Sequence, residues 1–301
     1  MRDEVKKKRA PSIPHASSFI PHPSSLIPSS LPPKKHFGQN FLADERIIER
    51  IVQEVRPRAA ETIVEIGAGH GALTSRLIDG SGRLFAIEFD RDLIPLLNEK
   101  FGAHENFTLI EGDALAVDLC AIIAPTAQQA RVVANLPYYI STAILQRLIE
   151  QRACLTEMVL MLQREVVARV TAPPASSERG FLSVLVEAYC ETETLFDVPP
   201  TAFRPIPKVW STVVRLRVRQ QPTVDVGDEH LFRRIVSAGF AQRRKTIFNN
   251  LRSAPADLYS QVEKAGGAER ALESAGIEAR RRAETLTLEE WGTLARVLEG
   301  V

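Results

Sequence analysis

The sequence predicts an α/β protein with a largely parallel central sheet, followed by a smaller helical region. From residue 62 onward, short apolar runs alternate with amphipathic stretches, and each run ends in Gly, Asp or Asn. The runs are rich in Val, Ile and Leu, as expected for parallel strands that are buried on both faces. Alternation of such runs with helical stretches is typical of βαβ units. These observations predict the fold class before any motif is considered.

The expected elements follow in order along the chain. The apolar runs are the expected strands, at residues 62–66, 84–87, 108–110, 131–134 and 158–162. The expected helices between them lie around residues 72–78, 92–101 and 142–151. Two later β-like runs, 189–196 and 211–218, have no expected helix between them and could form an antiparallel edge pair. Beyond Pro222 the apolar residues recur at helical spacing.

Residues 1–33 differ in composition from the rest of the chain. A charged start is followed by Pro and Ser interleaved with single Ile, Leu or Phe, which cannot supply a core. We therefore expect a disordered Pro/Ser-rich tail at 1–33, a main domain at 34–221 and a helical domain at 222–301. A transit peptide is the alternative for the tail, although Asp3, Glu4 and the prolines argue against an amphipathic Arg/Ser helix.

The composition excludes several classes of protein. The chain has 301 residues, of which 45% are hydrophobic and 25% charged, and its formal net charge is +1. Any attraction for a polyanion must therefore come from local clustering of charge. No apolar run reaches the ~18 residues of a membrane span, and the histidines show no metal-ligand spacing. The odd, widely spaced cysteines Cys120, Cys154 and Cys190 predict free thiols in a reducing, cytoplasmic environment.

A glycine-rich turn follows the first expected strand. Ile66 leads into the sequence GAGHG, where glycines allow a sharp turn and a close approach of the backbone to a ligand. The GxGxG spacing differs from the GxGxxG of dinucleotide-binding sites, which weakens the case for a bound pyrophosphate. A tight turn without a ligand is the alternative.

Acidic residues follow the next two strands. Glu88 lies about 20 residues after Gly67, where doubly wound folds place a carboxylate that binds ribose hydroxyls. Asp113 follows the next strand and could accept a hydrogen bond from an adenine amine. Either acid alone could be a helix N-cap. Because the carboxyl ends of parallel strands meet at one edge of a sheet, the two acids together predict one nucleoside-binding crevice.

The fourth strand ends in the most specific motif, Asn135-Leu136-Pro137-Tyr138. The lone pair of an exocyclic adenine amine is delocalised into the ring, so a methylation site must hold both N–H bonds and aim the lone pair at the methyl group. The Asn135 side-chain oxygen and the Leu136 carbonyl, held by Pro137, can accept those N–H bonds. Tyr138 can stack on the base. These residues are the expected catalytic set; a strand ending in a Pro turn with a buried Tyr is the alternative.

Basic residues gather in the helical region without acidic neighbours in the sequence. They lie between residues 231 and 256 and are Arg233, Arg234, Arg243, Arg244, Lys245 and Arg252. Phosphate neutralisation supplies much of the affinity for nucleic acids, so we expect these residues to contact an RNA backbone. A solvated helix face is the alternative.

Motifs in the same order along residues 34–301 resemble the ribosomal RNA adenine N6-dimethyltransferases, in particular the small-subunit (KsgA) family. The motifs are KKHFGQNFL at 34–42, EIGAGHG at 65–71, EGDA at 111–114, NLPYYIST at 135–142 and FRPIPKV at 203–209. The resemblance implies a Rossmann-like class I methyltransferase fold with a small C-terminal all-helical domain. Family members most often carry Asn where this chain has Tyr139.

The same resemblance implies roles for individual residues. The cofactor would be S-adenosylmethionine (SAM), bound by Asn40, Leu42, Gly67, Gly69, Glu88, Asp113 and Asn135. Asn40 and Leu42 would close over the cofactor, and the glycines would lie near its amino-acid end. Phe203 would join Tyr138 as a second stacking surface for the target base.

The implied activity is dimethylation of N6 of two adjacent adenosines in a hairpin near the 3′ end of 16S rRNA, coupled to small-subunit biogenesis. The partners would be small-subunit rRNA and the pre-30S subunit, with a monomeric, cytoplasmic protein and neither a metal nor a membrane. One alternative is a 23S rRNA adenine N6-methyltransferase of the macrolide-resistance type, which shares these catalytic features. Another is a binding protein that acts as a ribosome-assembly checkpoint. A DNA adenine methyltransferase is a third and is disfavoured by the Asn-Leu-Pro-Tyr variant of the motif.

Overall fold

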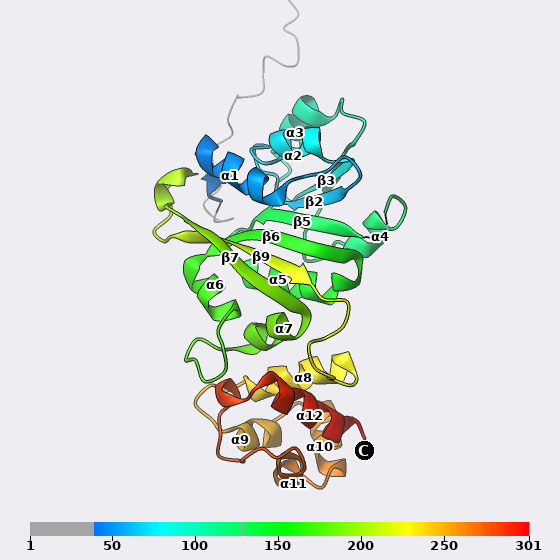
Figure 1. Cartoon of the computed structure of the whole chain (residues 1–301), viewed down its shortest axis with the longest axis vertical. Coiled ribbons are helices and arrows are strands. Elements are labelled where there is room, and N and C mark those ends of the chain that lie inside the picture. Colours follow the sequence, from blue (N-terminus) through cyan, green and yellow to red (C-terminus); the bar gives the residue numbers. More distant parts are fainter. Residues whose placement is uncertain (1–38, 128, 301) are drawn as a thin grey trace, which may run out of the picture. The chain divides into compact units, whose positions relative to one another are not determined.

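The computed structural model describes residues 39–127 and 129–300 (Figure 1). The predicted tail and residues 34–38 of the first motif lie outside this part of the chain. Its main sheet has seven strands in the order β4-β3-β2-β5-β6-β9-β7. Neighbours pair in parallel from β4 to β6, and β9 pairs antiparallel with both β6 and β7. The predicted α/β class is confirmed.

The predicted strands are all present, with boundaries that differ by a few residues. The parallel strands are β2 (Thr62–Ile66), β3 (Arg83–Glu88), β4 (Phe107–Glu111), β5 (Ala130–Asn135) and β6 (Leu155–Gln163). The two later runs form β7 (Cys190–Val198) and β9 (Ser211–Val218), which pair as predicted. Of these two strands, β7 lies at an edge of the sheet, and β9 lies between β7 and β6.

Helices connect the strands and cover both faces of the sheet. They are α1 (Glu45–Val55), α2 (Thr74–Gly80), α3 (Ile94–Phe101), α4 (Leu119–Ile123), α5 (Ser141–Glu150), α6 (Arg164–Val170) and α7 (Phe181–Tyr189). Val64 and Ile66 of β2 belong to the same buried cluster as residues of α5 and α7. Ile63 directly precedes Val64 and is also fully buried, and side chains alternate along a strand, so the opposite face is covered as well.

A second, two-stranded sheet supports the start of the described chain. In it, β1 (Phe41–Leu42) pairs antiparallel with β8 (Phe203–Arg204). Asp44 then caps α1 by accepting a hydrogen bond from the Arg46 N–H at 3.0 Å. This pairing joins two motifs that are far apart in the sequence.

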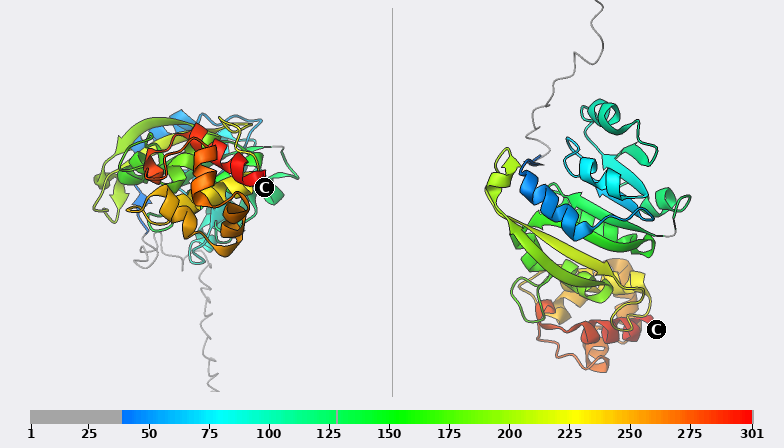
Figure 2. Two further views of the ribbon diagram at one scale, coloured as in Figure 1. Left: turned by 90° about the horizontal axis from the view of Figure 1, so that it is seen from below. Right: turned by 45° about the horizontal axis from the view of Figure 1, so that its top comes forward.

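The C-terminal region is helical, as the periodicity predicts. Its helices are α8 (Glu229–Gly239), α9 (Ile247–Arg252), α10 (Ala256–Lys264), α11 (Ala268–Ser274) and α12 (Leu288–Glu299). They lie beyond α7 in Figure 1 and in the right view of Figure 2, and α8 and α12 contact α7. Buried side chains form one cluster that continues from the sheet to Trp291 of α12. The division at residue 222 stays a prediction.

The cysteines depart from the sequence-based expectation. Cys120 of α4 and Cys154 form a disulfide, with their Cα atoms 5.3 Å apart, so the prediction of free thiols is wrong for these two. They are 34 residues apart in sequence and meet only because α4 packs against the turn before β6. Cys190 is a buried free cysteine, and burial raises the pKa of its thiol to about 12. None of the described helices is long and apolar enough to cross a membrane.

Candidate active site

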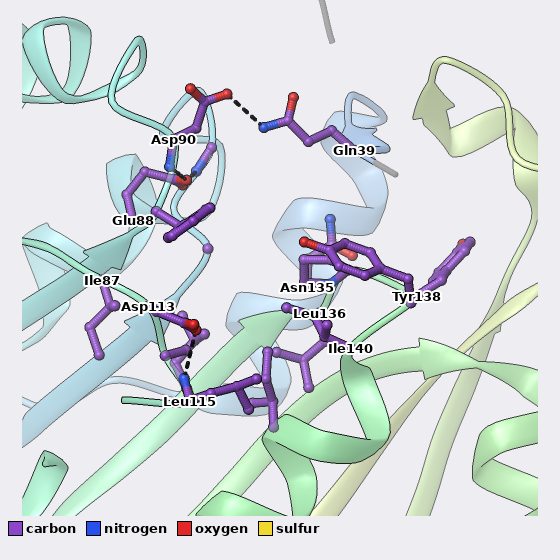
Figure 3. A pocket seen from close by; sticks show the side chains of 18 of the residues that line it. Gln39, Ile87, Glu88, Asp90, Asp113, Leu115, Asn135, Leu136, Tyr138 and Ile140 are labelled. Atoms are coloured by element: carbon purple, nitrogen blue, oxygen red, sulfur yellow. Dashed lines mark hydrogen bonds between the residues drawn. The ribbon is translucent and has the colours of Figure 1, made fainter. Parts of the chain in front are cut away.

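A pocket of about 250 Å³ opens at the carboxyl ends of β2, β3, β4 and β5 (Figure 3). Parallel α/β sheets bind their ligands at this edge, outside the ends of neighbouring strands. The lining comes from residues 39–41, the glycine turn, residues 87–90, residues 112–115 and residues 135–140, with Ile144 of α5 behind them. The predicted crevice is therefore present in the fold.

The glycine turn gives the pocket a wall made of backbone. Gly67 and Gly69 both have positive φ, +74° and +59°, which L-residues with side chains rarely adopt. The Gly67 N–H donates to the Ile87 carbonyl at 2.8 Å and ties the turn to β3. A Cβ on Gly67 would lie 3.8 Å from the backbone oxygen of Asn135 at the end of the neighbouring strand, and a Cβ on Gly69 would lie 3.1 Å from the Phe41 ring. Glycine at position 69 therefore lets the Phe41 ring pack closely against the turn.

Glu88 is fixed in place at the end of β3. One carboxylate oxygen accepts the Gly69 N–H and the other accepts the Asp90 N–H, each at 2.8 Å. Only 6% of the residue is exposed, and burial raises the pKa of its carboxyl despite these hydrogen bonds. Each oxygen retains acceptor capacity, so Glu88 is oriented to bind hydroxyl groups of a ligand.

Glu65 is a second buried acid beneath the glycine turn, and it was not among the predicted site residues. It accepts a hydrogen bond from the Thr74 hydroxyl at 2.6 Å, which links β2 to the start of α2. Desolvation, with a smaller contribution from the nearby Glu88 carboxylate, raises the pKa of the Glu65 carboxyl to about 8, although the Thr74 hydrogen bond opposes this shift. Two buried carboxyl groups, those of Glu65 and Glu88, therefore lie behind the pocket wall.

Asp113 shapes the opposite end of the pocket. Its Oδ1 accepts the Leu115 N–H at 2.9 Å, which holds the turn after β4. Leu115, Ile140 and Ile144 line the pocket close by. A flat heterocycle with an exocyclic amine would find apolar contacts and a carboxylate in the same place.

The end of β5 positions the predicted catalytic residues on the side of the pocket facing Glu88 and Asp113 (Figure 3). Asn135 Nδ2 donates to the Asn40 carbonyl at 3.2 Å. That bond uses one of the two Nδ2 N–H groups and holds the amide in place, and the Asn135 Oδ1 is the atom of this side chain that can accept a hydrogen bond from a ligand amine. Tyr138 is half-buried and its phenol shares a 2.7 Å hydrogen bond with the Ser211 hydroxyl of β9. This contact fixes the orientation of the ring.

Leu42 and Phe203 are not brought to the pocket. They face each other in the β1–β8 pairing, they are 6% and 0% exposed, and neither lines the cavity. A fully buried ring cannot stack on a substrate base in this conformation, so the stacking role expected of Phe203 has no support in the geometry. The pair instead anchors the strand that carries Asn40 and Phe41 into the pocket wall.

The comparisons with known proteins agree with this geometry. Residues 32–295 match the family model described as ribosomal RNA adenine dimethylase. The chain belongs to this family. Among its relatives, the ribosomal RNA small subunit methyltransferase A of Moorella thermoacetica is 43% identical over 89% of this chain and 93% of its own. The protein of that name from Clostridium botulinum (strain Loch Maree) is 41% identical, over 87% of this chain and 92% of its own.

Solved structures of similar proteins share the fold of this family member. The dimethyladenosine transferase from Plasmodium falciparum superimposes with a TM-score of 0.68 at 21% identity, over 84% of this chain and 95% of that one. The 23S rRNA methyltransferase ErmE gives a TM-score of 0.61 at 26% identity, over 86% of this chain and 100% of that one. The predicted Rossmann-like methyltransferase fold is confirmed.

Several pocket residues of this dimethylase-family chain escaped the sequence analysis. They are Gln39, Phe41, Phe89 and Asp90, together with the apolar residues 115, 140 and 144. Gln39 Nε2 donates to Asp90 Oδ2 at 2.9 Å and joins the two sides of the pocket wall (Figure 3). Gln39 and Phe41 lie within the first motif, and this motif was the sequence feature that could have identified them as pocket residues. Phe89 and Asp90 directly follow Glu88 and could have been inferred from the strand end.

The predicted RNA-binding residues separate into two groups. Arg233 forms an ion pair with Glu150 of α5, and Arg234 pairs with Asp257 of α10, so both have carboxylate partners that their own helix does not supply. Arg243, Arg244 and Lys245 are exposed in the turn between α8 and α9. Arg252 is also exposed, and its guanidinium lies 5.4 Å from the centre of the Phe248 ring. Among the described residues, no cluster of three or more His, Cys, Asp or Glu could hold a metal ion.

Proposed function

We propose that this member of the ribosomal RNA adenine dimethylase family uses SAM to dimethylate N6 of two adjacent adenosines in a hairpin near the 3′ end of small-subunit rRNA. The observation that carries the proposal is the orientation of Asn135. Its Nδ2 donates to the Asn40 carbonyl, which holds the amide in place, and Asn135 and Tyr138 both line the pocket. A fixed acceptor next to an aromatic ring is what a weakly nucleophilic adenine amine requires.

The residues at the sheet edge fit SAM. The cofactor supplies a methyl group on a positively charged sulfur. The backbone of Gly67 and Gly69 would border its amino-acid part, Glu88 has acceptor capacity for ribose hydroxyls, and Asp113 with its apolar neighbours suits adenine. The Glu88 carboxylate also favours a cationic ligand over the neutral thioether that remains after transfer, because negative charge in a buried site is poorly screened.

The catalytic residues act by alignment and need no strong base. Asn135 Oδ1 and the Leu136 carbonyl, at the turn made by Pro137, accept the two N–H bonds of the target amine. The Tyr138 ring, held by Ser211, stacks on the base. Turning an adenosine out of its stack costs a few kcal/mol, and each base–aromatic contact returns about 1–3 kcal/mol. The rate then comes from orientation and from the loss of charge at sulfur.

The relatives favour the small subunit as substrate. Proteins named ribosomal RNA small subunit methyltransferase A are 41% and 43% identical to this chain, whereas ErmE, named for 23S rRNA, is 26% identical. The proposed partners are therefore small-subunit rRNA and the pre-30S subunit, with a monomer acting in the cytoplasm. The Cys120–Cys154 disulfide is uncommon for that compartment, so the redox state of this pair in cells tests the assignment.

The decisive experiment maps methyl groups on RNA. Small subunits and large subunits that lack the modification are incubated with the protein and labelled SAM, and both rRNAs are read by mass spectrometry at nucleotide resolution. We expect two methyl groups on each of two adjacent adenosines of the small-subunit RNA. Label in the large-subunit RNA alone would refute the proposal, and binding without label would favour a checkpoint role.

A further inference from the structure

Large apolar side chains are exposed on the pocket lining and on the segment that joins β8 to β9. Tyr139, Ile206 and Trp210 are 57%, 59% and 47% exposed. Tyr139 lines the pocket, and the other two belong to residues 205–210, which join β8 to β9. Large apolar side chains are usually buried, so an exposed group of them next to a pocket indicates a binding surface. We call these three residues the pocket rim.

Both ends of residues 205–210 are attached to elements that form the pocket. At one end β8 pairs with β1, whose Phe41 lines the pocket. At the other end Trp210 directly precedes Ser211, the residue whose hydroxyl holds the Tyr138 phenol. The Trp210 carbonyl also accepts the Arg164 N–H at 3.0 Å, which fixes the backbone at this point. Trp210 is therefore the sequence neighbour of Ser211, which holds the proposed stacking ring of Tyr138.

The charged side chains of this surface are mainly basic. Arg204 and Lys208 are exposed, and residues 203–210 include no acidic residue. The Arg164 side chain is 64% exposed and has one carboxylate nearby, Asp197 at 3.8 Å. Pro205 and Pro207 restrict the backbone, so little conformational freedom is lost when a ligand binds here. An exposed indole beside cations is the combination that binds unpaired nucleotides.

We propose that Trp210 stacks on the nucleotide next to the target adenosine in the same RNA strand. The inference rests on the proposed function, in which the substrate has two adjacent adenosines. One of them enters the pocket against Tyr138 while its neighbour is held on the rim, and the cations nearby contact the connecting phosphates. Trp210 is thus a positioning residue that selects an unpaired dinucleotide over a single extruded base.

Intrinsic fluorescence provides a direct test that needs no catalysis. The chain has two tryptophans, and Trp291 is fully buried, so accessible emission comes from Trp210. An RNA hairpin with two adjacent loop adenosines should quench this emission and protect it from acrylamide. A hairpin in which the neighbouring nucleotide is abasic should bind without that quenching, and Trp210→Phe should remove the signal while Trp291 still emits.

Affinity and kinetics supply the second readout. Trp210→Ala should weaken hairpin binding about tenfold, within the range of one base–aromatic contact. On small subunits lacking the modification it should raise KM by a similar factor and leave kcat within about twofold, and Trp210→Phe should restore most of the loss. With the abasic hairpin, the variant and the unaltered protein should bind equally. Tyr259→Ala is the matched control, because Tyr259 is 40% exposed on α10 and should change nothing.

Specific outcomes would overturn the inference. Equal hairpin binding by Trp210→Ala and the unaltered protein would do so, as would an equal loss on intact and abasic RNA. A raised KM on small subunits with unchanged hairpin binding would assign the rim to a protein partner instead. Failure of the unaltered protein to methylate any RNA would remove the proposed function, which the fluorescence measurement distinguishes from failure of the rim.

Discussion

The sheet edge and the helical region use charged residues in opposite ways. At the edge, the acids Glu65 and Glu88 are buried and bound by a hydroxyl or by backbone N–H groups of neighbouring turns. In the helical region, Arg233 and Arg234 form ion pairs with acidic residues of other helices, and the basic residues of the α8–α9 turn are exposed. The position of a side chain at a strand end is set by the sheet itself. The role of a surface arginine instead depends on which helix or strand packs next to it.

The inter-region contacts show why only part of the basic cluster is available. Arg233 pairs with Glu150 of α5, and Arg152 pairs with Glu229 at the start of α8. The Arg152 guanidinium also lies 3.9 Å from the centre of the Tyr189 ring. These cations join the helices to the sheet layer, so they contribute to packing and have less freedom to bind phosphate.

In the sheet region, removal of the disulfide should have the largest effect on stability. Closing a loop between residues 34 positions apart should stabilise the protein by about 3–4 kcal/mol. The Cys120→Ser/Cys154→Ser variant should therefore unfold at a lower urea concentration than the oxidised protein. Added reductant should lower the midpoint of the unaltered protein and leave the variant unchanged. Alkylation and mass spectrometry count the thiols, and three alkylated cysteines in the native oxidised protein would contradict the pairing.

Glu65 should make the sheet edge sensitive to pH. The pKa of its carboxyl is about 8 in the folded protein and 4.5 in the unfolded chain. Its unfavourable contribution to the free energy of unfolding is therefore absent below pH 4.5 and grows as the pH rises towards 8. At pH 7 this is on the order of 3 kcal/mol. Glu65→Gln, which keeps an acceptor for Thr74, should flatten the fall in unfolding free energy between pH 5 and 8.

Urea titrations across that pH range measure the effect, with Glu111→Gln as the control. Glu111 ends the neighbouring strand β4 and is exposed, so its replacement should leave the pH profile unchanged. Parallel profiles for Glu65→Gln and the unaltered protein would mean that Glu65 is ionised at little cost.

Asn135→Ala should remove alignment of the target amine without unfolding the sheet. We expect methyl transfer to slow by about 100-fold, the loss associated with a misplaced reactant. RNA affinity should stay within about threefold, measured by hairpin titration. A variant with near-normal turnover would remove Asn135 from the mechanism.

The exposed turn of the helical region should give the smallest of these effects, on RNA binding alone. Arg243→Glu/Arg244→Glu should weaken hairpin affinity by about tenfold and lower the salt slope by roughly 0.7 for each lost phosphate contact. The matched variant Arg233→Ala/Arg234→Ala should instead lower the melting temperature and keep the slope, because these side chains are already paired. Equal slopes for both variants would mean that the turn faces away from the RNA.

The nucleoside pocket could be predicted because its residues follow directly from strand ends. Gly67, Glu88, Asp113 and Asn135 each follow or end a strand of the parallel sheet, and such ends meet at one edge whatever the loops do. Phe203 was predicted from a motif alone. Its ring turned out to be buried against Leu42, because β8 pairs with β1 and not with the pocket.

The sequence by itself determined the parallel sheet, the crevice at its carboxyl edge and the residues that we propose carry out methyl transfer. These follow from local periodicity and from motifs whose spacing has a direct geometric meaning. Only the tertiary structure decided the Cys120–Cys154 pairing, the partners of Arg233 and Arg234, and the contact between Tyr138 and Ser211. Each of these depends on contacts between segments distant in the chain, and no local pattern encodes which surfaces will meet.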